Sequence, residues 1–461
     1  MRGLTKGGMF HSGAIIAIGR ATGIIFAFCL NLLLARILSK EDFGRINFIF
    51  CVVAVFVAIA KFGMDRLLLK IISEARGQMR PDQMRTLLRN SALINAPAAL
   101  VAFLAIALLM PLFPAIENLQ NRETIILLTG LCVAGTTYLQ LTTECFRGMN
   151  EIVKCTIYDG QRSGPAISIL FTAGLFGVAI LSQGGQETTL GVVLAIYIAV
   201  QCIVVVLASL SFYKTALNIN CSVMAPAHSA TETSVSFHYL LFASYPIAIS
   251  ETFGVLASFG DMWVASFALS ITELANWTVA SQLTQLTSIP LTVINLTIIS
   301  QIPKLHRDGK LGELQTVLQA SATMATAVCL LPMAAFIFLP RWLVCTTFGN
   351  EYSDAAAAVA VISVGKLIFV WTGPCGYTLL LTGFQRIVMT SNVLSFFAIA
   401  IGGYAAAKAY GLTGLAVATS AITITLNLYL WIMARRHSQV WTHCSVRYVC
   451  FKLWPRKCVG K

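Results

Sequence analysis

Long apolar runs recur along the whole chain and constrain its fold more than any other feature. A helix needs roughly 20 apolar residues to cross a hydrocarbon layer about 30 Å thick. The runs lack the short apolar and polar alternation of barrel strands, so they predict about twelve membrane-spanning helices. The predicted spans are 12–34, 44–64, 91–113, 124–146, 156–181, 189–213, 239–262, 274–301, 316–339, 355–381, 388–408 and 412–434.

Composition and charge placement fit an all-α polytopic membrane protein. Hydrophobic residues make up 57% of the chain and charged residues 11%, whereas soluble domains carry about 25% charged residues. Most of the 32 Lys and Arg residues fall in alternate loops, which predicts that both termini are cytoplasmic. This placement, together with attraction to anionic membrane lipids, accounts for the net charge of +13 without a nucleic-acid partner.

The chain contains two weak internal echoes that suggest a duplicated half. Leu38-Ser39-x-x-Asp42-Phe43-Gly44 aligns with Leu269-Ser270-x-x-Glu273-Leu274-Ala275, and a Gly148 segment aligns with a Gly383 segment at a similar offset. A parallel repeat predicts two six-helix lobes with substrate between them near the midplane. The expected divisions are an N-terminal lobe 1–213, a cytoplasmic linker 214–238, a C-terminal lobe 239–434 and a basic cytoplasmic tail 435–461.

The tail combines basic residues with Trp441 and Trp454, which is typical of a segment lying on a membrane surface. Its His437, His443 and cysteines lack the CxxC or HxxxH spacing of a zinc site, so no metal is expected.

Three cations lie inside predicted spans, where a charge needs a cavity or a partner. Arg20 lies in the first span on a face with small residues, which leave room beside its guanidinium. Lys61 is near the end of the second span, where it lines a cavity or reaches the interface with its long side chain. Lys366 lies deeper and faces a cavity or pairs with an acidic residue.

Two predicted spans carry polar stripes at helical spacing. In 274–301, a line of amide and hydroxyl groups with Pro290 available to kink the helix suggests either a sugar-lined path or hydrogen bonding between helices. The span 124–146 repeats this pattern. The stripe residues are Ser281, Gln285, Ser288, Thr292 and Asn295 in the former, and Thr136, Gln140, Glu144 and Arg147 in and directly after the latter.

Acidic residues inside the spans are candidates for ion coupling. Glu251 is central in the span 239–262, Asp261 lies toward its far end, and Glu144 belongs to the stripe of the fourth span. A buried carboxylate without a cation would bind and release a proton as access alternates. Pairing of Glu251 with Lys366 or Arg20 is the alternative.

No ATP-binding or catalytic motif is found in the sequence. It has no GxxxxGK[ST], HExxH or GxSxG stretch. The short loops leave no room for a separate catalytic domain, so no enzymatic activity and no cofactor are expected. A proton or sodium gradient is the candidate for the driving force of transport.

The stretch Leu34-Ala35-Arg36-Ile37-Leu38-Ser39-Lys40-Glu41-Asp42-Phe43-Gly44 resembles the "LARxLSxxDFG" junction of the Wzx-type oligosaccharide and polysaccharide flippases. These belong to the multidrug, oligosaccharidyl-lipid and polysaccharide (MOP) exporter superfamily. Further matches in register are Phe62-Gly63, like that family's "FG" exit from helix 2, Asp261 late in the seventh span, Phe348-Gly349-x-Glu351-Tyr352, and Tyr410-Gly411-Leu412-x-Gly414.

The resemblance implies two six-helix lobes that alternate access around a cationic cavity in a bacterial inner membrane. The cavity would receive an undecaprenyl-diphosphate-linked oligosaccharide, with Arg20, Lys61 and Lys366 as candidates for the diphosphate and Gln140, Gln285 and Asn295 for the sugar. The product would be O-antigen, capsule or exopolysaccharide, and a polysaccharide polymerase is a candidate partner. Two alternatives stay open: a drug or metabolite efflux transporter of the same superfamily, and a membrane enzyme of polysaccharide assembly.

Overall fold

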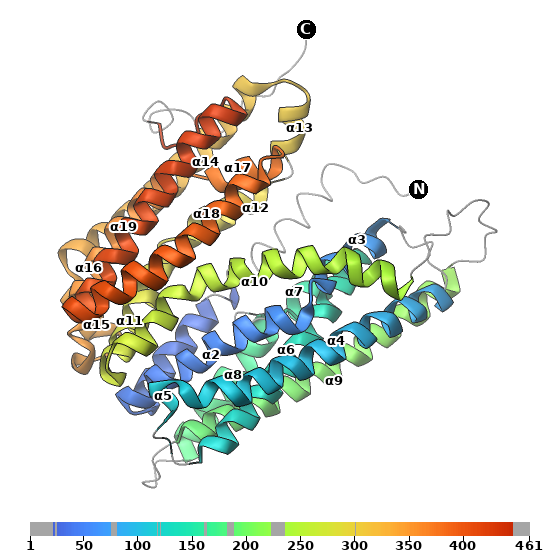
Figure 1. Cartoon of the computed structure of the whole chain (residues 1–461), viewed down its shortest axis with the longest axis horizontal. Helices are drawn as coiled ribbons and strands as arrows, with labels where there is room; N and C mark the ends of the chain where they lie inside the picture. Colours follow the sequence, from blue (N-terminus) through green and yellow to red (C-terminus); the bar gives the residue numbers. More distant parts are fainter. Residues whose placement is uncertain are drawn as a thin grey trace. The chain divides into compact units, whose positions relative to one another are not determined.

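The computed structural model describes residues 22–23, 25–74, 81–117, 119, 121–160, 164–181, 189–222, 236–299 and 301–445. These residues form helices and connecting turns, with no strand among them (Figure 1). The all-helical fold expected from the apolar runs is therefore confirmed. The chain forms two compact units, Met1–Ala275 (unit 1) and Asn276–Lys461 (unit 2).

Unit 1 is built around α2, which packs against α4, α6 and α10. Its residues are mostly apolar and buried, as expected for a helix surrounded by others. Because α10 packs with these helices, the compact unit extends beyond the predicted linker 214–238; the predicted lobe boundaries stay a prediction. The elements are α2 (Lys40–Lys61), α3 (Met64–Glu74), α4 (Pro81–Leu109), η1 (Met110–Leu112), α5 (Pro114–Glu117), α6 (Arg122–Gly148), α7 (Ile152–Ile157), α8 (Pro165–Leu181), α9 (Leu190–Ser222) and α10 (Phe237–Ala268).

Unit 2 is organised around α16, which packs against α14 and α19. The chain enters it through α11, whose first residues still belong to unit 1. The elements are α11 (Ile271–Leu286), α12 (Ile289–Ile298), α13 (Gln301–Arg307), α14 (Leu311–Phe338), α15 (Pro340–Thr347), η3 (Asn350–Tyr352), α16 (Ala355–Thr372), α17 (Cys375–Leu381), α18 (Gln385–Ala398), η4 (Ile399–Gly403) and α19 (Tyr404–Ser438).

Eight helices in the described part of the chain are long and apolar enough to cross a membrane. One of them, Gln385–Ser438, has 54 residues, and Gly411 interrupts it with a left-handed φ of 61°. Two shorter apolar helices cover Ile25–Ile37 and Pro165–Val178. A multi-pass membrane protein is thus supported, whereas the expected number of twelve spans stays a prediction.

The predicted span 274–301 is broken and not continuous. α11 ends at Leu286 and α12 begins at Ile289, with Pro290 in the first turn of α12. Proline has no amide hydrogen to donate and fits best at the start of a helix. The kink expected at Pro290 is therefore confirmed, and the role of the polar line along this span stays a prediction.

The two echoed junctions have the same local structure. Ser39 begins α2 by accepting a hydrogen bond at its Oγ from the amide of Asp42, at 3.2 Å. Ser270 begins α11 by accepting one from the amide of Glu273, at 3.3 Å. Such caps satisfy amides that the first helical turn leaves unpaired. The structure thus gives the sequence echo a physical meaning, since both segments start a helix in the same way.

The beginning of the tail packs into unit 2. α19 continues through Ser438, and Val440 and Thr442 behind it are fully buried. Polar groups of unit 2 hydrogen-bond with residues 439–445, and the position of the tail on a membrane surface stays a prediction. Residues 446–461 lie outside the described part of the chain.

Candidate functional site

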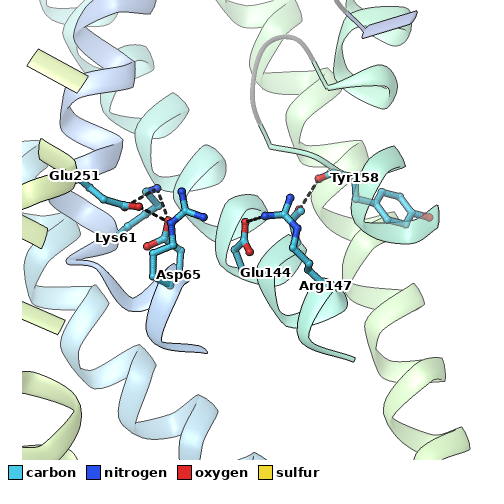
Figure 2. Close-up of polar contacts among 8 residues, drawn as sticks. Lys61, Asp65, Glu144, Arg147, Tyr158 and Glu251 are labelled. Atoms are coloured by element: carbon cyan, nitrogen blue, oxygen red, sulfur yellow. Dashed lines mark hydrogen bonds and ion pairs between the residues drawn. The ribbon is translucent and has the colours of Figure 1, made fainter. Parts of the chain in front are cut away.

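A group of charged side chains lies in unit 1 where the junction of α2 and α3 meets α10 (Figure 2). α2 ends at Lys61, and the next residues, Phe62 and Gly63, both have left-handed backbones, with φ of 49° and 71°. A Cβ at Gly63 would lie 2.6 Å from the carbonyl oxygen of Ser244 in α10. The glycine therefore permits both the sharp turn and the close approach of α10.

This turn brings Lys61, Asp65 and Arg66 to the same side of α10. Lys61 Nζ lies 2.6 Å from Asp65 Oδ2 and 3.5 Å from Glu251 Oε2. Arg66 Nε donates to Glu251 Oε1 at 2.7 Å. We call these four residues the junction network. It joins the α2–α3 turn to α10 through charge-assisted hydrogen bonds, which are stronger than neutral ones.

Burial differs sharply among the members of the junction network. The side chains of Asp65 and Lys61 are 6% and 13% exposed, and that of Glu251 is 20% exposed. Arg66 is 56% exposed. Burial lowers the pKa of Arg66, but its hydrogen bond with Glu251 and the attraction of that carboxylate outweigh this effect and raise the pKa above its ordinary value. Arg66 thus stays charged and presents its outer nitrogens to the surroundings.

A second ion pair lies near the junction network on α6. Arg147 Nη1 donates to Glu144 Oε1 at 2.6 Å, with side chains 40% and 12% exposed (Figure 2). Glu144 also interacts electrostatically with Arg66. Next to this pair, Thr143 Oγ1 donates to the carbonyl of Tyr158 at 3.0 Å.

Two further acid oxygens are buried without a hydrogen-bond partner in the described structure, and these are Asp65 Oδ1 and Glu144 Oε2. Spare buried acceptors of this kind suit a proton or a donor group of a ligand.

Two predicted site residues on α6 and α10 are not members of the junction network, and a third is not among the described residues. Arg20 falls outside the described residues. Gln140 is half-buried on α6, four positions before Glu144. Asp261 is half-buried on α10, where its carboxylate accepts from the amide of Met262 at 2.9 Å.

The polar stripe of α6 serves in part to join helices. Gln201 of α9 donates from Nε2 to Thr136 Oγ1 at 2.7 Å and to the carbonyl of Cys132 at 3.1 Å. This is the interhelical hydrogen bonding that the sequence left open as an alternative. The polar character of Thr136 is therefore explained by packing.

The remaining predicted residues belong to unit 2. Lys366 is half-buried on α16, with its ammonium 5.8 Å from the centre of the Phe369 ring. Gln285 is exposed near the end of α11. Asn295 is buried in α12, and its Oδ1 has no hydrogen-bond partner among the described residues.

Sequence reasoning missed Asp65 and Arg66 because it assigned both to the edge of a loop. The partner proposed for Glu251 was Lys366 or Arg20, whereas the structure pairs it with Lys61 and Arg66. One signal was available: Lys61 and Asp65 carry opposite charges and lie only four positions apart, on either side of the Phe62-Gly63 turn. The pairing of Arg66 with Glu251 joins residues 185 positions apart and left no local signal.

Solved structures with a similar fold include a lipid II flippase and transporters of the MOP superfamily. Lipid II flippase MurJ in an inward closed conformation matches with a TM-score of 0.67 and 16% identity, covering 92% of this chain and 87% of that one. An inward-facing MATE transporter of the MOP superfamily matches with 0.63 and 14%, covering 92% and 98%. A MOP superfamily transporter from Pyrococcus furiosus matches with 0.61 and 12%, covering 93% and 95%. The fold is thus of the MOP type.

The sequence of the chain shows its family. Residues 10–306 match the model of the polysaccharide biosynthesis protein family, so the chain belongs to that family. No match was found among curated proteins. The family assignment agrees with the resemblance carried by the Leu34–Gly44 junction.

Proposed function

We propose that this protein is a flippase that moves an undecaprenyl-diphosphate-linked oligosaccharide from the cytoplasmic to the periplasmic leaflet of a bacterial inner membrane. The repeat unit would then enter O-antigen, capsule or exopolysaccharide synthesis, with a polymerase acting afterwards. The family and the MOP fold support this class of activity. The observation that carries the proposal is Arg66, an exposed guanidinium held in a largely buried ionic network.

Arg66 fits a diphosphate better than Lys61 does. Its Nε is bonded to Glu251, which leaves the two outer nitrogens for phosphoryl oxygens, and guanidinium groups bind these oxygens through paired hydrogen bonds. Lys61 lies between two carboxylates and would reach substrate only after one of them is released. Arg20 and Lys366 stay proposed ligands of the diphosphate, and Gln140, Gln285 and Asn295 of the sugar.

Coupling to an ion gradient is proposed at the carboxylates Glu251, Glu144 and Asp261. A proton bound to Glu251 would weaken its attraction for Arg66 and free that guanidinium for substrate. A sodium ion would act on the same oxygens, since carboxylates are also its natural ligands.

An efflux transporter is the second candidate, because MATE transporters share the fold. A cationic drug would be bound by carboxylates, yet Glu251 and Glu144 are each paired with an arginine here. This pairing makes a cationic drug the less favoured substrate. A membrane enzyme of polysaccharide assembly is the least favoured class.

The test compares Arg66→Gln and Arg66→Lys in cells that depend on this chain for surface polysaccharide. If Arg66 binds the diphosphate, Gln should abolish transport, Lys should retain part of it, and both proteins should be normally abundant. Arg307→Gln is a matched control, because Arg307 is 80% exposed in unit 2. Lipid-linked oligosaccharide should accumulate on the cytoplasmic leaflet of the Gln variant only. A normally active Arg66→Gln protein would remove Arg66 from the substrate site.

A further inference from the structure

Residues 439–445, which we call the C-terminal strap, turn back from the end of α19 and pack into unit 2. Gln439 takes a left-handed backbone with φ of 57°, which reverses the chain. The Trp441 ring then lies 4.8 Å from that of Trp431, and the His443 ring lies 5.4 Å from it. The strap therefore runs back along α19.

The strap supplies hydrogen bonds to the broken end of α16. A helix leaves its last carbonyls without partners, and here α16 ends at Thr372 before α17 begins. The amide of Cys444 donates to the carbonyl of Trp371 at 2.8 Å. Thr442 Oγ1 donates to the carbonyl of Thr372 at 2.7 Å. Two carbonyls exposed by the break are thus satisfied by the strap.

Gly373 at the break fits the strap closely. Its φ of 72° and ψ of −157° suit glycine alone. A Cβ there would overlap the carbonyl oxygen of Thr442 and lie 2.7 Å from the Cβ of Ala322. The break and the strap are therefore matched in both conformation and shape.

The strap also contacts α14, so it joins three helices of unit 2. The amide of Trp441 donates to Gln315 Oε1 at 3.2 Å. The amide of Ser445 donates to Thr323 Oγ1 at 3.1 Å. With the ring contacts to α19, these bonds connect α14, α16 and α19 through one short segment.

We propose that the C-terminal strap is a positioning element that fixes the break between α16 and α17 and so orients Lys366. Lys366 precedes Thr372 by less than two helical turns, so a change in the direction of α16 moves its ammonium group. The strap and the end of α16 then move as one body during transport. The consequence for Lys366 rests on the proposed function, whereas the fixing of the break does not.

Two truncations of the full chain test the proposal. A stop after Ser438 removes the strap, and a stop after Ser445 is the matched control that keeps it. Hydrogen exchange at residues 366–381 should become at least about tenfold faster without the strap and stay unchanged in the control, because local opening follows lost hydrogen bonds. Surface polysaccharide should fall in the first truncation only. Unchanged exchange after loss of the strap would overturn the proposal.

A point variant keeps the test valid if the shorter truncation is poorly inserted. Thr442→Val keeps the shape but removes the donor to the Thr372 carbonyl, and Thr413→Val on the exposed side of α19 is its control. Exchange at the break should rise severalfold in Thr442→Val alone. Faster exchange with normal transport would support the strap as a clamp but overturn its effect on Lys366. Equal exchange in the two variants would overturn the proposal itself.

Discussion

Removal of Lys61 is expected to destabilise the protein far more than removal of Arg66, although both cations belong to the junction network. Lys61→Met leaves Asp65, whose side chain is 6% exposed, beside Glu251 without the ammonium between them. Breaking a buried ion pair in this way costs about 3–5 kcal/mol. Arg66 is 56% exposed, so Arg66→Gln loses at most about 1 kcal/mol.

The two variants differ in cost because the groups that they leave unpaired differ in their contact with solvent. Water and lipid headgroups can replace the contacts of an exposed guanidinium, but they do not reach Asp65. Neutralising this carboxylate should therefore restore much of the loss. We expect the double variant Lys61→Met with Asp65→Asn to be more stable than Lys61→Met alone, which a double-mutant cycle measures as a coupling energy.

Membrane abundance and thermal unfolding of the purified protein in detergent would be measured for the single variants, the double variant and Arg307→Gln. We expect low abundance for Lys61→Met only, with recovery in the double variant. Equal loss for Lys61→Met and Arg66→Gln would refute it. So would a double variant as unstable as the sum of its single changes.

Three further expectations concern Gly63, His443 and the topology. Gly63→Ala should lower the free energy of unfolding by more than about 1 kcal/mol, because it adds strain at a left-handed residue and a clash with the Ser244 carbonyl. An unchanged melting temperature would contradict this. His443 accepts a hydrogen bond from a tryptophan at 3.2 Å, and burial lowers its pKa. The strap should therefore be fully bound to unit 2 when the pH is above about 6.5, and it should loosen as the pH falls below that value. Fluorescence of the strap tryptophan that stays constant from pH 7 to 5 would argue against this. Reporter fusions at Asn350 should read periplasmic and those at Lys310 cytoplasmic; the reverse result would overturn the proposed topology.

The features that depend on residues close together in the sequence could be predicted from the sequence alone. Apolar runs define helices in lipid because each segment must satisfy its own backbone. Ser39 and Ser270 begin helices because serine caps act within three residues. Pro290 marks a break for an equally local reason. These parts of the fold were accessible without a structure.

The junction network and the strap depend on contacts between distant residues. Glu251 has three possible cations within the predicted spans, and only the packing of α10 on the α2–α3 turn selects Lys61 together with Arg66. The packing of the strap was missed because the strap belongs to a tail, 435–461, whose two tryptophans and basic residues have the composition of a surface segment. The predicted span 355–381 ran unbroken through Gly373 and Pro374, and nothing nearby indicated that Thr442 hydrogen-bonds to the end of α16 there.

The charges in and near the junction network balance, and this balance limits how the proposed function can work. Three cations stand against three carboxylates, namely Lys61, Arg66 and Arg147 against Asp65, Glu144 and Glu251. A neutral group attracts a diphosphate weakly until one carboxylate is neutralised or moved. We infer that proton uptake at Glu251 and diphosphate binding at Arg66 favour each other. Because such coupling is reciprocal, bound substrate should raise the proton affinity of Glu251 by the same factor by which the proton raises substrate affinity.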